Sequence, residues 1–184
     1  MPRTSLSTTV VIQAVATYLS LCDLWTPRDP LEVEYKDEYS NGYGLNKATR
    51  MWTDSRRLAA TSETLDLWGV LEDAWGHTIK FTNVKVIAIR NTSTVDGEDL
   101  LVGGAAANTW ASMFGDVSDK LKIKPGVTLT ISNTYDGYPV TSTTDQLKID
   151  AGASDITYEL VLIGEHSSTT STSTSTSSTS TTSP

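Results

Sequence analysis

The residue types that most often carry out catalysis are few and isolated in this chain of 184 residues. Its two histidines, His77 and His166, have no serine and acid at a spacing from which a catalytic triad could be argued. Cys22 ends an apolar stretch, where a thiol is expected to be buried and inert. Motifs that bind nucleotide phosphates, dinucleotides or catalytic zinc are absent from the sequence. The sequence therefore predicts a protein that is not an enzyme and that uses no cofactor.

Acidic residues offer a second kind of chemistry, metal binding. Asp96, Glu98 and Asp99 fall in one turn and could supply oxygen ligands to calcium, but they lack the spacing and the final glutamate of an EF-hand loop. We interpret them as a solvated turn, with a metal site as the weaker alternative. Carboxylate pairs for glycoside hydrolysis are defined by their separation in space, so the sequence singles out none.

Tryptophan and tyrosine are the most informative residues. The chain has five Trp and seven Tyr but only two Phe. Trp and Tyr suit surfaces that are buried against a partner and keep a polar tip. Three interpretations stay open: a subunit interface, a platform on which sugars stack, and ordinary core packing for at least two tryptophans. The tryptophans lie mostly near predicted turns or strand ends, at Trp25, Trp52, Trp68, Trp75 and Trp110.

Charged residues next to one tryptophan mark the best candidate contact. Trp52 is followed by Asp54, Arg56 and Arg57, which could join apolar burial to charge-assisted hydrogen bonds. The alternative is that Asp54 and Arg56 simply pair across neighbouring strands. The candidate interface residues are Trp52, Asp54, Arg56, Arg57, Trp75 and Trp110.

Composition excludes several classes of function. Lys and Arg total 14 against 22 Asp and Glu, a net charge of −8, and nucleic acids or anionic membranes require the opposite sign. A single cysteine excludes an intrachain disulfide framework. No apolar stretch is long enough to span a membrane. The apolar run at residues 10–16 is too short for a signal peptide, so we expect a buried N-terminal strand there.

Period-two alternation of apolar and polar residues predicts strands along most of the chain. Residues 31–36 alternate, with Leu31, Val33 and Tyr35 expected to point into the core, and residues 84–89 are apolar on both faces, as in a central strand. Further strands are expected at 8–19, near 51 and 65, and at 79–82, 121–124, 127–131, 147–149 and 156–163.

Turn signals separate these segments at intervals near ten residues, which is typical of an antiparallel sandwich. Helical turns are expected only within 66–75 and 105–113. The sequence thus predicts an all-β fold, a β-sandwich or jelly-roll-like arrangement of about eight to ten short strands.

Two regions of different composition divide the chain. Residues 1–166 form the predicted β-sandwich domain, and residues 167–184 form a Ser/Thr-rich low-complexity tail. The tail has no hydrophobic or charged residue, so we expect it to be disordered or extended. It could serve as a tether or as an arm that orders on a partner, or be a dispensable extension.

The order of several short segments resembles small virion structural proteins of tailed bacteriophages and prophages. The resemblance covers roughly residues 50 to 164 and depends on the order of the segments rather than on any one of them. The segments are 52–58 (WTDSRRL), 65–67 (LDL), 71–76 (LEDAWG), 81–85 (FTNVK), 102–105 (VGGA), 124–126 (KPG), 137–141 (GYPVT), 145–149 (DQLKI) and 157–164 (TYELVLIG).

The resemblance implies a virion component with no catalytic residues, located on the head or in the tail. Together with the composition, it favours a capsid decoration or cement protein that binds the major capsid protein or other virion subunits. We expect a homo-oligomer, a dimer or trimer, in a particle assembled in the host cytoplasm. The alternative function is a tail-associated carbohydrate-binding or host-recognition module.

Overall fold

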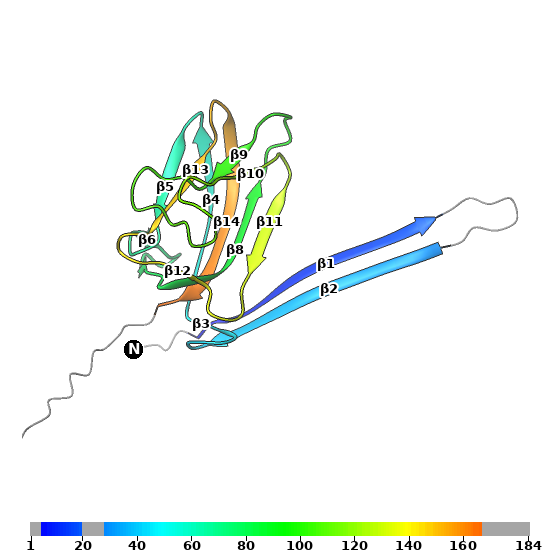
Figure 1. The fold of residues 1–184 in the computed structure, drawn as a ribbon, viewed down its shortest axis with the longest axis horizontal. Helices are drawn as coiled ribbons and strands as arrows, with labels where there is room; N and C mark the ends of the chain where they lie inside the picture. Colours follow the sequence, from blue (N-terminus) through cyan, green and yellow to red (C-terminus); the bar gives the residue numbers. More distant parts are fainter. Residues whose placement is uncertain (1–4, 20–27, 167–184) are drawn as a thin grey trace, which may run out of the picture.

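The computed structural model describes residues 5–19 and 28–166, and within them the chain is all-β, with fourteen strands and no helix (Figure 1). A four-stranded sheet and a five-stranded sheet form a sandwich-like body. One has the order β10 (Leu121–Ile123), β9 (Leu100–Val102), β13 (Gln146–Asp150), β5 (Ser62–Asp66). The other has the order β11 (Thr128–Ser132), β8 (Asn83–Asn91), β14 (Asp155–Glu165), β4 (Arg50–Ala59).

Shorter strands complete the body. β12 (Tyr138–Pro139) pairs with β8, while β6 (Leu71–Glu72) and β7 (Thr78–Ile79) form a small hairpin of their own. The all-β prediction is confirmed, and jelly-roll connectivity stays a prediction. The sequence underestimated the number of strands, because two-residue strands carry no readable alternation. Residues 66–75 and 105–113, each of which could have held one helical turn, contain no helix: the first holds the end of β5, a turn and β6, and the second is loop and turn with one isolated bridge at Thr109.

Outside the body, β1 (Ser7–Leu19) and β2 (Arg28–Asn41) form a long hairpin that projects from one end of the sandwich (Figure 1). β3 (Lys47–Ala48) pairs in parallel with the inner end of β2. The hairpin is a two-stranded ribbon over most of its length. A buried N-terminal strand was expected at 10–16, and the burial was wrong: Val11, Ile12 and Val15 are exposed.

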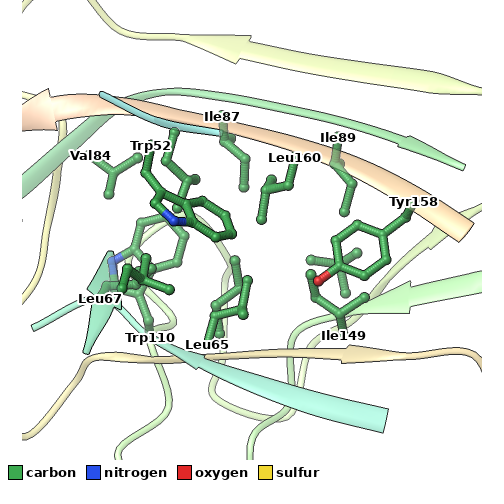
Figure 2. Packing of buried hydrophobic residues seen from close by; sticks show 14 of the residues in the cluster. Trp52, Leu65, Leu67, Val84, Ile87, Ile89, Trp110, Ile149, Tyr158 and Leu160 are labelled. Carbon is green, nitrogen blue, oxygen red and sulfur yellow. The ribbon is translucent and has the colours of Figure 1, made fainter. Parts of the chain in front are cut away.

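The core lies between the two sheets, where large side chains interdigitate (Figure 2). Trp52, Leu65 and Trp110 are all at most 3% exposed. The predicted central strand is confirmed in β8, which is buried on both faces from Val84 to Ile87. The predicted inward side of the last strand is also confirmed, since its members Ile156, Tyr158, Leu160 and Leu162 are fully buried.

A β-bulge interrupts the pairing of β8 with β14. Ile163 pairs with Val86 and Gly164 pairs with Val84, so Lys85 is the extra residue. A Cβ atom at Gly164 would overlap the carbonyl oxygen of Asn83, so only glycine fits there. The bulge turns Lys85 out of the ladder and toward the base of the hairpin.

Candidate functional site

The projecting hairpin, called the arm below (residues 11–19 and 28–36), has two unlike faces. Register pairs Ile12 with Tyr35, Ala14 with Val33 and Ala16 with Leu31, and directly paired residues share a face. These six side chains are the apolar face of the arm. Ile12 is 44%, Leu31 54% and Tyr35 67% exposed. Leu31, Val33 and Tyr35 share a face as predicted, but the expectation that they point into the core was wrong.

The opposite face of the arm carries its charged side chains beside the exposed Val11 and Val15, and we call it the acidic face. Here Val11 pairs with Lys36, Gln13 with Glu34 and Val15 with Glu32. Gln13 Nε2 donates to Glu32 Oε1 at 3.3 Å, and Lys36 Nζ lies 2.5 Å from Glu38 Oε1. The hydrogen bond from Lys36 lowers the pKa of Glu38, so this carboxyl is ionised at neutral pH. The arm is therefore amphipathic, although nothing in the described chain covers its apolar face.

At its inner end the apolar face continues into a small cluster packed on the outside of the β8–β14 sheet. Tyr39, Ala48, Val86 and Ile163 are buried there, with Val10 and others packed around them. The Tyr39 hydroxyl and Ser132 Oγ are 2.7 Å apart. We call this cluster the root of the arm. At the root, this ribbon face packs against the body; along the arm, the same face is exposed.

A buried ion pair fastens the turn next to the root. Lys85 is fully buried, and its Nζ donates to the carbonyl oxygens of Gly44 at 2.5 Å and Tyr135 at 3.3 Å. Nζ also lies 3.5 Å from Glu165 Oε2. Glu165 in turn accepts the Gly44 N–H at 3.0 Å and the Asn83 side-chain amide at 3.1 Å. Charged side chains of the body thus hold the turn that follows β2.

The second candidate site is an open cleft of about 710 Å³ at the edge of the sandwich where β4 and β5 face each other. We call it the slot. Its walls are β4 from Met51 to Asp54 with Arg56, β5 from Thr64 to Asp66, and the loop from Val70 to Trp75. β4 and β5 are both edge strands, so no further strand of the described residues closes this side of the inter-sheet space.

Charged groups bridge the two sheets beside the slot. Arg56 Nε donates to Asp54 Oδ2 at 2.8 Å, and its Nη1 donates to Glu63 Oε2 on β5 at 2.5 Å. Its guanidinium also lies 5.4 Å from the centre of the Trp52 ring. Burial disfavours the charged guanidinium, but the hydrogen bonds to Asp54 and Glu63 outweigh it and raise the pKa of Arg56. Arg56 therefore stays cationic and donates hydrogen bonds to two carboxylates.

A buried tyrosine extends the same network. The Tyr158 hydroxyl donates to Glu63 Oε1 at 2.8 Å. Burial, reinforced by the neighbouring Glu63 carboxylate, raises the pKa of Tyr158 well above its usual value. Tyr158 is therefore a fixed hydrogen-bond donor. It orients Glu63, which leaves the second oxygen of that carboxylate for Arg56.

The two tryptophans of the slot differ in exposure. Trp52 is 3% exposed, and its indole N–H donates to the Glu72 carbonyl at 3.0 Å. Trp75 is 76% exposed. A tight turn holds Trp75, because Asp73 Oδ1 accepts the N–H groups of Trp75 and His77, both at 2.9 Å. The N–H of His77 is the main cause of the lowered pKa of Asp73.

Four of the six candidate interface residues line the slot: Trp52, Asp54, Arg56 and Trp75. Asp54 and Arg56 do pair with each other, but they do so along β4 and not across neighbouring strands as the alternative had it. Arg57 points the other way and forms a bidentate pair with Asp155 on β14. Trp110 is fully buried, donates to the Pro139 carbonyl at 2.9 Å and so belongs to the core.

The remaining predicted chemistry is dispersed. Glu98 accepts the Ser93 hydroxyl, and Asp99 pairs with Lys122 at 3.0 Å. Across residues 5–19 and 28–166, no three His, Cys, Asp or Glu side chains form a metal-binding group.

Nδ1 of His166 is buried without a hydrogen-bond partner in the described chain, and this burial lowers its pKa. Cys22, Trp25 and the predicted tail lie outside the described residues.

Comparison of the chain with protein-family models, curated protein sequences and solved structures finds no match. Among the described residues there is no helix long and apolar enough to cross a membrane. The arm was missed by sequence reasoning as a functional element. Its signal was present in the alternation of residues 31–35, because Leu31, Val33 and Tyr35 share one ribbon face while Glu32 and Glu34 lie on the other.

Proposed function

We propose that this protein is a non-enzymatic structural subunit of a bacteriophage particle, a capsid decoration or cement protein that self-associates and binds the major capsid protein lattice. The arm is the observation that carries the proposal. The virion context comes from the resemblance of residues 50–164 described above.

The arm has an apolar face that none of residues 5–19 and 28–166 covers. A two-stranded hairpin is only marginally stable in water, and it gains stability when one face packs against another surface. Burying a large apolar side chain such as Leu31 or Tyr35 contributes about 1.5–3 kcal/mol. The arm reaches about 30 Å beyond its root at the rise of a β-strand, so it can contact a neighbouring subunit.

A second copy of this chain is the partner that we assign to the apolar face. The chain carries a net charge of −8, so two copies repel each other over most of their surface. None of the six side chains that form the apolar face is charged. Packing it against another copy leaves Glu32 and Glu34 in water on the opposite face. Modest contacts of this kind, repeated over a symmetric shell, give high total avidity.

The test of self-association compares the two faces of one strand. We expect the double variant Leu31→Ser/Tyr35→Ser to be monomeric in light-scattering chromatography of the full chain, where the native chain is a dimer or trimer. The matched control Glu34→Ser/Lys36→Ser alters the acidic face without changing net charge, and it should still associate. A monomeric native chain, or equal loss in both variants, would contradict the proposal.

The test of location is the copy number in purified particles of the virus that encodes this chain. Quantitative mass spectrometry should give a simple fixed ratio to the major capsid protein. A handful of copies per particle would move the protein to the tail or neck, and complete absence would refute the virion assignment.

A further inference from the structure

We propose that the slot between β4 and β5 binds a neutral carbohydrate chain, an activity beyond the proposed structural role. The slot does not overlap the root of the arm, which packs on the outer face of the β8–β14 sheet. At about 710 Å³, its volume lies within the range of roughly 300–1,000 Å³ typical of small-ligand sites.

The exposed ring of Trp75 is the first argument. An indole that is 76% exposed at the mouth of a cleft exposes apolar area that a ligand can cover. The negative face of an aromatic ring attracts weakly positive hydrogens, such as the C–H groups on one face of a sugar ring. The turn built on Asp73 holds the backbone of Trp75, so little ordering is needed on binding.

The charges of the slot decide which ligand fits. Four carboxyl side chains line it (Asp54, Asp66, Glu72 and Asp73), so an anionic ligand is repelled. Arg56 also lines it, but its charge is already balanced by Asp54 and Glu63, so it does not offset the repulsion of an anion. A neutral ligand avoids this repulsion, and a cationic probe tests whether the excess of acidic residues binds a cation instead.

Hydroxyl groups match the polar atoms that the slot presents. An ionised carboxylate only accepts hydrogen bonds and has about four acceptor positions, whereas the guanidinium of Arg56 only donates. Asp66 uses one oxygen to accept the Trp68 N–H at 2.8 Å, and as a carboxylate it has further acceptor positions. A sugar hydroxyl can donate to a carboxylate and accept from Arg56 or a threonine hydroxyl. A chain of sugars can therefore hydrogen-bond to both the acceptors and the donors of the slot without adding a charge.

The experiment titrates the full chain with neutral hexasaccharides of glucose, mannose, galactose and N-acetylglucosamine and follows binding by calorimetry. Polygalacturonate and a hexalysine peptide serve as charged probes. We expect at least one neutral saccharide to bind, with Trp75→Ala weakening its affinity at least tenfold and Trp75→Phe weakening it less. Tyr135→Ala removes an equally exposed aromatic side chain away from the slot, and it should bind as the native chain does.

Three results would overturn the proposal: no neutral saccharide binds, Trp75→Ala binds as tightly as the native chain, or only a charged probe binds at the slot. The two proposals fail separately. The Leu31→Ser/Tyr35→Ser variant should lose self-association and keep saccharide affinity, and Trp75→Ala should do the reverse.

Discussion

At the residue scale, the Tyr158 hydroxyl is the group whose environment departs most clearly from water. It is fully buried and donates to Glu63, and its pKa is raised above the unfolded value of about 10. A raised pKa means that folding favours the protonated phenol. Its contribution to stability is complete below pH 10 and is lost as the pH rises above that value, because the unfolded chain then releases the proton and the folded chain does not.

The corresponding prediction concerns alkaline unfolding. The free energy of unfolding, measured with urea at pH 8, 9, 10 and 11, should fall above pH 10 in the native chain. Tyr158→Phe should lose about 1 kcal/mol at pH 8, the contribution of one hydrogen bond, and should fall less steeply above pH 10. If the free energy of unfolding fell equally steeply above pH 10 in both proteins, a group other than Tyr158 would control the loss of stability at alkaline pH.

The sequence predicted part of the residue-scale picture. Asp54 and Arg56 two positions apart on a strand must share a face, so their pairing could be expected. Their link to Glu63 and Tyr158 could not, because it depends on how the two sheets are stacked. Trp75 and Trp110 were equivalent candidates in sequence. The turn at Asp73 exposes the first, and packing between the sheets buries the second.

At the element scale, alternation showed which side chains share a strand face but not what covers that face. In β14 the shared face meets the opposite sheet, and the prediction of burial was right. In β2 the same pattern lies in a ribbon that leaves the body, and the prediction was wrong. Both strands alternate apolar and polar residues. This alternation shows which side chains share a face, but it does not show whether that face lies against the same chain.

The clamp formed by Lys85 and Glu165 fastens the turn that follows β2 to the body and gives a prediction at this scale. Lys85→Met should lower the free energy of unfolding by about 3–5 kcal/mol, because it leaves the Glu165 carboxylate buried without its cation. The double variant Lys85→Met/Glu165→Gln should recover part of the loss.

Lys36→Met is the control for the clamp, since Lys36 also pairs with a glutamate but is exposed to water, where such pairs contribute little to stability. Urea unfolding of the full chain measures all three variants. If Lys85→Met were no worse than Lys36→Met, the clamp would stabilise the fold no more than an exposed ion pair does.

At the scale of the whole molecule, the strong acidity and the uncovered apolar face act in opposite directions. Like charges keep copies apart at long range, whereas the apolar face favours contact at short range. The two ranges differ in their response to salt, because screening weakens charge repulsion and leaves apolar burial almost unchanged.

Self-association should therefore strengthen as salt is added. Between ionic strengths of 0.01 and 0.15 M the screening length falls from about 30 to about 8 Å, so most of the repulsion between copies disappears while the arms can still pack. Sedimentation velocity of the full chain should show a larger associated fraction at the higher ionic strength. The Leu31→Ser/Tyr35→Ser variant should remain monomeric at both. Association that weakened with salt would mean that ion pairs hold the copies together, and the apolar face of the arm would lose its assigned role.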